Sequence, residues 1–192
     1  MLCAMATASR PLLRRPITWI VLAVAAVAVA VGLYLFQPWK LFVNETVDEG
    51  LPVATAPAAG APAPAGSEGS APSVSTEPKV LASGDLISHE HPTSGTVQLL
   101  ELPDGSKVVR LQDLNTSNGP LLRVFLTDAP VIEGTDGWGV FDDGRYVDLG
   151  DLKGNIGSSN YVIPAGTDIT GLNSVSIWCD RFDVSFGAAT LS

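Results

Sequence analysis

The stretch from Ser174 to Phe186 reads SVSIWCDRFDVSF and decides the fold of the C-terminal half of the chain. Within it, every second residue from Val175 to Cys179 is apolar, which is the two-residue period of a β-strand. A second alternating run follows and ends at Phe186. The pattern predicts two neighbouring strands, with Cys179 pointing to the apolar face and Trp178 pointing the other way.

Working outward from these strands, residues 80–192 contain short apolar stretches separated by Gly, Asn, Asp and Pro. Asp104-Gly105 has the form of a hairpin turn between two apolar stretches. No helical period of useful length is present. Regular short strands with turn signals predict an all-β domain, a β-sandwich or jelly-roll-like fold. The expected strands are the two sides of the 99–111 hairpin and residues 121–127, 145–149, 160–163, 174–179 and 182–186.

A different pattern occupies residues 17–36, which read ITWIVLAVAAVAVAVGLYLF and contain no charged side chain. As a helix this stretch is about 30 Å long, the thickness of a bilayer's hydrocarbon core. Arg10, Arg14 and Arg15 precede it, so the positive-inside rule places residues 1–16 in the cytoplasm and the rest outside. We therefore expect a signal-anchor, a single-pass transmembrane helix in the cell membrane with an extracytoplasmic C-terminal domain.

A cleaved signal peptide is the competing interpretation of the apolar segment. Its apolar region would be shorter, and a small-x-small cleavage site would follow closely. Residues 37–42, QPWKLF, are a poor cleavage site, and Ala54-Thr55-Ala56 lies far downstream.

Residues 37–79 form the expected linker between helix and domain. From Asn44 to Lys79 the linker is rich in Ala, Pro and Gly and has no aromatic residue. Such a segment cannot bury enough apolar surface to offset its ordering entropy, so we expect it to be disordered. Fully extended, it would reach on the order of 100 Å, so it would serve as a stalk.

The charge balance limits the partners of the outer domain. Residues 80–192 carry 6 basic and 15 acidic side chains, a net charge of −9. This acidity repels phosphate backbones, so nucleic acid is excluded as a partner. No Gly-x-Ser-x-Gly or His-Glu-x-x-His motif is present, so no hydrolase is indicated. Whether the protein is an enzyme is left open.

Two cysteines occur, Cys3 before the apolar segment and Cys179 after it. They would lie on opposite sides of the membrane and cannot pair within one chain. An unpaired thiol in an oxidising compartment requires an explanation. One explanation is a buried, inert side chain. The other is a redox thiol, or a ligand to a metal or haem.

His89 and His91 are the only histidines, in the sequence Ser-His-Glu-His-Pro. Two residues apart on a strand, they would project from one face and could bind one metal ion. Such a site needs a third ligand, and Glu90 points to the opposite face. The alternative is that both are exposed strand residues with no binding role.

Several blocks of the domain have a familiar order. They include Asn118-Gly119-Pro120, Asp148-Leu-Gly-x-Leu-Lys-Gly-Asn-x-Gly157 and Ile177-Trp178-Cys179. In this order and spacing, over nearly all of residues 80–192, the chain resembles the DM-thirteen domain family, described as electron-transfer domains.

The resemblance implies an extracellular β-sandwich-like domain with a redox role centred on Cys179. The thiol would act bare or bind a group such as haem or a metal ion, with Trp178 beside it. Family members often carry an acid directly after the Gly-Pro pair, and here that position is Leu121.

Two hypotheses follow from the sequence. The first is a membrane-anchored domain that takes part in envelope redox or electron transfer through Cys179, with an envelope redox partner. The alternative is a non-catalytic binding or interaction module with a structural, buried cysteine.

Overall fold

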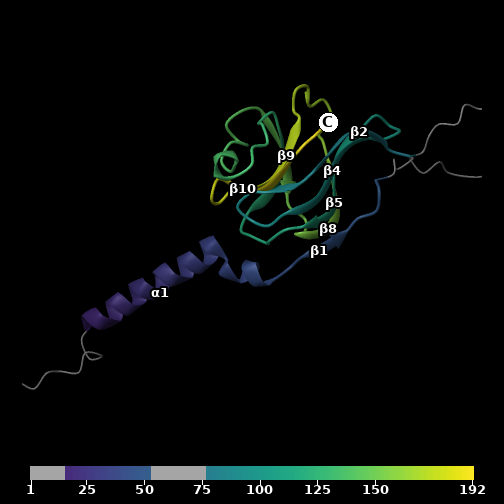
Figure 1. Ribbon diagram of the computed structural model, residues 1–192. Coiled ribbons are helices and arrows are strands. Elements are labelled where there is room, and N and C mark those ends of the chain that lie inside the picture. Colours follow the sequence, from purple (N-terminus) through teal and green to yellow (C-terminus); the bar gives the residue numbers. More distant parts are fainter. Residues whose placement is uncertain (1–15, 53–76) are drawn as a thin grey trace, which may run out of the picture. The chain divides into compact units, whose positions relative to one another are not determined.

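The structure is a computed structural model that describes residues 16–52 and 77–192 (Figure 1). The chain divides between Pro38 and Trp39 into two compact units. The first contains the helix α1, Pro16–Phe36. This helix is long and apolar enough to cross a membrane, and a signal sequence near the N-terminus shares these properties.

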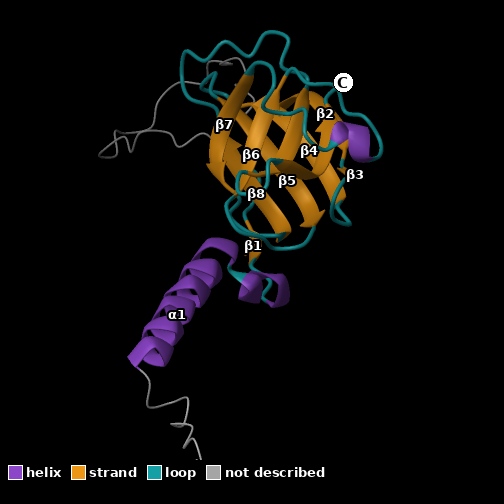
Figure 2. Cartoon of the chain, turned by 90° about the vertical axis from the view of Figure 1, so that its left-hand side faces the viewer, coloured by secondary structure: helices purple, strands orange, loops and turns teal. Residues whose placement is uncertain are grey.

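The second unit contains two five-stranded sheets, and the prediction of an all-β sandwich is confirmed (Figure 2). The first sheet has the order β1-β8-β5-β4-β2, and the second has the order β3-β10-β9-β6-β7. All pairings are antiparallel except β1 with β8, which is parallel. Two short 3₁₀ helices, η2 and η3, complete the described elements. The bounds are η2 Pro38–Phe42, β1 Thr46–Asp48, β2 Lys79–Asp85, β3 Ile87–Ser88, β4 Ser94–Glu101, β5 Lys107–Asn115, β6 Leu122–Thr127, η3 Thr135–Gly137, β7 Tyr146–Asp151, β8 Ile156–Val162, β9 Ser174–Cys179 and β10 Val184–Thr190.

The main core lies between the two sheets, because each contributes the apolar residues of one face. The first sheet contributes every second residue of β4 and β5. The second sheet contributes the corresponding residues of β6 and β9. The fully buried members on these four strands are Val97, Val109, Leu111, Val124, Leu126, Val175, Ile177 and Cys179.

A second, smaller core covers the other face of β9. It contains Trp178, Phe125, Phe141, Ala129 and Ala188. Every residue of β9 is therefore buried, and neighbouring residues point into different cores. The predicted sidedness of Cys179 and Trp178 is confirmed.

Part of the predicted linker belongs to the first sheet. Residues 44–52 were expected to be disordered, but β1 lies within them and pairs with β8. The prediction is wrong for this part because the hydrogen-bonding partners of β1 lie more than a hundred residues away, where local composition gives no sign of them. Residues 53–76 lie outside the described residues.

The position of β1 also changes the role of the linker. β1 and β2 are the two edge strands of the same sheet, and the Ala/Pro-rich run connects them. The stalk interpretation is therefore wrong, since the chain already joins the sheet before the run begins.

Candidate functional site

Cys179 ends β9 with its side chain fully buried in the main core. Its Sγ–H donates a hydrogen bond to the Pro120 carbonyl oxygen at 3.3 Å. Burial raises the pKa of the thiol, and backbone hydrogen bonds from Arg181 and Phe182 oppose this without reversing it. The negative charge of Glu90 raises the pKa further. The side chain is therefore a protonated thiol at neutral pH, not a thiolate.

The carbonyl oxygen that accepts from the thiol belongs to the loop Gly119-Pro120-Leu121, which we call the lid. A Cβ at Gly119 would lie 2.9 Å from the Phe186 ring, so any larger residue there would have to displace this ring. Leu121 has a φ of 53°, in the left-handed region that costs a non-glycine residue about 1 kcal/mol or more. Its side chain is exposed, at the position where an acid was expected from the resemblance. The lid over Cys179 is thus strained and apolar.

Trp178 does not share a pocket with Cys179. Its indole is 1% exposed and packs in the second core, with ring centroids 5.9 Å from Phe125 and 6.5 Å from Phe141. A group bound to the thiol would meet the opposite face of β9 from the indole. The two residues that the resemblance placed together are neighbours in sequence only.

The sequence predicted that His89 lies on a strand, exposed if it binds nothing, but it is buried and lies outside a strand. β3 ends at Ser88, and the imidazole of His89 is buried. Its Nδ1 lies 2.9 Å from Ser185 Oγ and its Nε2 lies 3.2 Å from the Ile132 carbonyl oxygen. The carbonyl can only accept, so Nε2–H donates and Nδ1 accepts from the hydroxyl. Burial lowers the pKa of His89, which keeps the ring neutral.

His91 lies in a different environment. Its ring packs on Phe186 at 3.9 Å between centroids, whereas His89 lies against Phe141 in the second core. The two rings therefore do not project together from one strand face, as the metal prediction required. Among the described residues, no group of three or more His, Cys, Asp or Glu is arranged to hold a metal ion.

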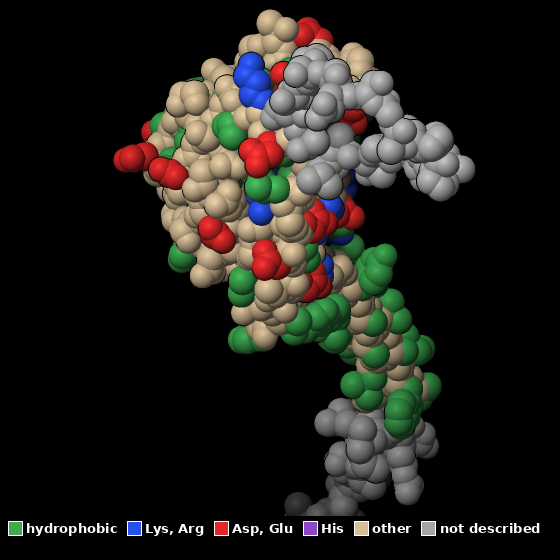
Figure 3. All heavy atoms as spheres, turned by 90° about the vertical axis from the view of Figure 1, so that its right-hand side faces the viewer, with side chains coloured by type: hydrophobic (Ala, Val, Ile, Leu, Met, Phe, Trp, Pro, Cys, Tyr) green, Lys and Arg blue, Asp and Glu red, His purple; other side chains and the backbone are tan. Residues whose placement is uncertain are grey.

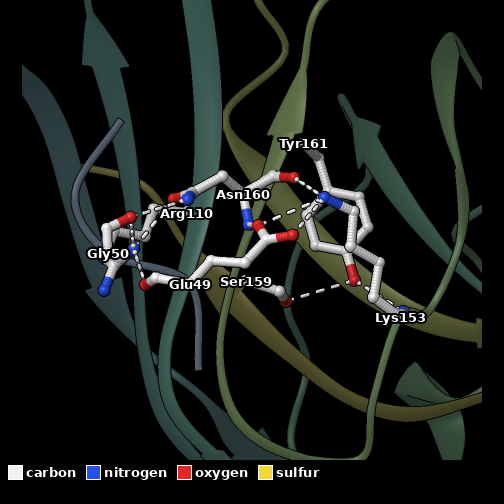
Figure 4. A network of polar contacts seen from close by, with 7 residues as sticks. All are labelled: Glu49, Gly50, Arg110, Lys153, Ser159, Asn160 and Tyr161. Atoms are coloured by element: carbon white, nitrogen blue, oxygen red, sulfur yellow. Dashed lines mark hydrogen bonds and ion pairs between the residues drawn. The ribbon is translucent and has the colours of Figure 1, made fainter. Parts of the chain in front are cut away.

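Sequence reasoning missed a polar cluster that holds the segment after the helix. Figure 4 shows Arg110 of β5 and Asn160 of β8 beside Glu49 and Gly50. Arg110 Nη1 donates to the carbonyl oxygens of Glu49 and Gly50, both at 3.0 Å. The Glu49 carboxylate accepts from Lys153 Nζ at 2.8 Å and from the Asn160 backbone N–H at 2.7 Å.

Two asparagines hold the beginning of the same segment. The Glu45 N–H donates to Asn155 Oδ1 at 2.7 Å. Asn118 Nδ2 donates to the Val43 carbonyl oxygen at 3.0 Å. We call residues 43–50 with these side-chain partners the clamp. A signal for it was present in the sequence, because Arg110 and Asn160 are polar residues inside predicted strands and require partners when buried.

The clamp gives a pH-dependent prediction. Burial would raise the pKa of Glu49, but hydrogen bonds from Lys153 and Asn160 outweigh it and lower the pKa below 4.5. The folded state then binds fewer protons than the unfolded state, so stability is gained as pH rises and lost as pH falls through the folded pKa. We expect Glu49→Gln to be less stable than wild type at neutral pH, and we expect the difference to vanish as the pH falls through the lowered pKa of Glu49.

Urea unfolding at several pH values measures this difference. Glu133→Gln is the matched control, since Glu133 is an exposed glutamate outside the clamp. A stability difference between Glu49→Gln and wild type that stays constant down to acid pH would contradict the ionic role of Glu49.

The comparisons with known proteins identify the family. A family model described as Electron transfer DM13 matches residues 85–191, which is more than half of the 192 residues. No curated protein and no solved structure matches the chain. The matched range contains Cys179 and its lid, but it begins after the clamp segment. The chain belongs to the electron transfer DM13 family, as the order of its Asn-Gly-Pro and Ile-Trp-Cys blocks predicted.

Proposed function

We propose that this protein is a membrane-anchored electron-transfer domain held on the extracytoplasmic side of the cell membrane, with Cys179 as its redox group. The observation that carries the proposal is the match to an electron-transfer family over a domain whose only cysteine in the described ranges is Cys179. The helix α1 and the arginines before it support the anchor and its orientation.

The clamp favours an uncleaved anchor over a signal peptide cut at Ala54-Thr55-Ala56. A cut there would remove residues 43–50 from the chain. It would leave Arg110, which is 7% exposed, without two of the carbonyl oxygens that accept from its Nη1. Loss of partners for a buried cation is destabilising. Because the domain depends on residues 43–50 for these hydrogen bonds, the clamp supports the retention of this segment in the mature protein.

Two properties limit the chemistry of Cys179: no second cysteine lies in the described residues, and its thiol is protonated. A disulfide within the chain would need a second sulfur, and the described residues contain none. A protonated thiol can instead lose one electron and its proton to a one-electron acceptor carried by a partner protein. Because the side chain is fully buried, access requires the lid at Pro120 and Leu121 to open.

A second candidate function is favoured by the same burial. A thiol with no exposed surface, donating to a backbone carbonyl, also satisfies all the requirements of an inert core residue. The protein would then be a non-catalytic interaction module of the envelope. The two candidates differ in whether Cys179 can be reached without unfolding the domain.

Alkylation of the native protein separates the two candidates. The full chain carrying Cys3→Ser is purified in detergent, and the alkylation rate of Cys179 is measured against low concentrations of urea. If the lid opens locally, Cys179 reacts faster than the domain unfolds, and urea changes the rate little, because local opening exposes little surface. Cys3→Ser/Cys179→Ser gives the background rate.

A Cys179 rate equal to that of global unfolding, with the same urea dependence, would support the structural cysteine and overturn the redox proposal. An absorption spectrum and a metal analysis of the same sample test for a bound group. A colourless, metal-free protein with a locally accessible thiol is the expected result for redox chemistry at the bare sulfur.

A further inference from the structure

The clamp limits the length of free chain between the helix and the domain. α1 ends at Phe36, and the Val43 carbonyl is already held by Asn118. Residues 37–42 alone join these two points, and a fully extended chain of that length spans at most about 25 Å. Since Pro38–Phe42 forms a 3₁₀ helix, the real reach is shorter. If α1 spans a bilayer, the domain cannot stand far from the lipid surface.

The end of the domain that is tethered in this way is also the end that contains Cys179. Asn118 belongs to the loop that follows β5 and leads through Pro120 to β6. Cys179 lies opposite Leu122, the first residue of β6, and its thiol donates to Pro120. The Asp104-Gly105 turn lies before the other end of β5, about 30 Å away along a nine-residue strand.

Exposed apolar side chains lie at the tethered end. Phe42 is 88% exposed, Val43 is 51% exposed and Leu121 is 41% exposed. Leu121 follows Asn118 by three residues, so the hydrogen bond from Asn118 to Val43 brings these side chains to one region. Acidic side chains are scattered over the face of the domain that Figure 3 shows. Aromatic and aliphatic residues placed beside a membrane helix favour the headgroup region.

We propose that this end of the domain, with Phe42, Val43 and Leu121, rests on the phospholipid surface of the membrane that α1 crosses. The proposal depends on the membrane anchor proposed above, but not on redox activity. It places Cys179 and its lid towards the bilayer, so a redox partner would approach from within the plane of the membrane. The strong acidity of the domain disfavours anionic headgroups, so zwitterionic phosphatidylcholine should suffice for docking.

Paramagnetic broadening of amide signals tests this orientation. The isotope-labelled full chain is placed in phosphatidylcholine nanodiscs containing a lipid with a gadolinium chelate on its headgroup. We expect the Leu121 and Leu122 amides to broaden several-fold more than the Ser106 and Ala165 amides at the opposite end of β5. Ala165 belongs to that end because the Ile163 N–H donates to the Lys107 carbonyl oxygen.

The variant Phe42→Ser/Leu121→Ser removes the apolar contact and leaves the clamp residues unchanged. We expect it to reduce the broadening of the Leu122 amide several-fold, with an otherwise unchanged amide spectrum, because the short tether alone would then hold the domain near the lipid. Equal broadening at both ends of the wild-type domain would overturn the docking proposal, whatever the alkylation of Cys179 shows. Broadening of the Leu122 amide that is as strong in the double variant as in the wild type would also overturn it, because the apolar side chains would then not hold the domain to lipid.

Discussion

Replacing Trp178 by alanine is expected to lower the free energy of unfolding by about 3–5 kcal/mol. The indole is 1% exposed and is the largest fully buried side chain in the described residues. It fills the centre of the second core, against Phe125 and Phe141. Alanine would leave a cavity there, and the strands on both sides of β9 prevent the surroundings from collapsing into it.

Chemical denaturation at neutral pH measures the effect, with two controls. Trp178→Phe keeps an aromatic ring and is expected to cost about 1–2 kcal/mol. Tyr146→Ala removes a half-exposed ring that stacks on Phe125 and is expected to cost about 1 kcal/mol. If Trp178→Ala costs no more than Tyr146→Ala, the second core does not contribute to stability as the packing indicates.

The variant Trp178→Phe also tests whether the packing of the indole affects access to the Cys179 thiol. Trp178→Phe retains the fold but removes the indole, and the indole lies on the opposite face of β9 from the thiol. We therefore expect the alkylation rate of Cys179 to be nearly unchanged in Trp178→Phe. A large change in that rate would show that the two faces of the strand are coupled.

Substitution of Gly157 by alanine is expected to release β1 from the first sheet and to cost about 2–4 kcal/mol. Gly157 has a φ of 101° and lies opposite Val47 in the parallel pairing. An added Cβ would overlap the Val47 carbonyl oxygen. Both the backbone conformation and the close approach of β1 therefore require glycine.

Gly150 provides a closely matched control for this prediction. Its φ of 106° is nearly the same, but an added Cβ would meet no atom within 4 Å. Gly150→Ala should therefore show only the conformational cost, about 1–2 kcal/mol.

Hydrogen exchange localises the effect of the Gly157 substitution. The Glu49 N–H donates to the Ser158 carbonyl oxygen across the β1 and β8 pairing, so this amide reports whether β1 is in place. We expect its protection to fall sharply in Gly157→Ala and to persist in Gly150→Ala. Equal protection in both variants would mean that β1 tolerates the added methyl group and that the clamp has room to adjust.

Release of β1 would also remove the short tether on which membrane docking depends. The free chain between Phe36 and the first sheet would then extend through the Ala/Pro-rich run to β2. The gadolinium-lipid experiment on Gly157→Ala should accordingly show weak broadening throughout the domain. The close approach of Gly157 to Val47 therefore affects both the stability of the domain and its docking to the membrane.

The sequence alone determined the features that depend on local spacing. Two-residue alternation gave the strands, the sandwich and the opposite sidedness of Cys179 and Trp178, because neighbouring side chains on a strand must point to opposite faces. The length of the uncharged segment gave α1, and the order of the Asn-Gly-Pro and Ile-Trp-Cys blocks gave the family.

Tertiary structure alone decided which distant groups meet. The three-residue strand β1 has no apolar alternation, and the contacts of Glu45 and Glu49 lie 110 and 111 residues away. His89 looked exposed in sequence, yet Ser185 and Ile132 enclose its ring. These contacts are backbone and side-chain hydrogen bonds whose donors and acceptors occur at nearly every residue. Composition therefore does not distinguish one partner from another, and only the packing of the two sheets selects them.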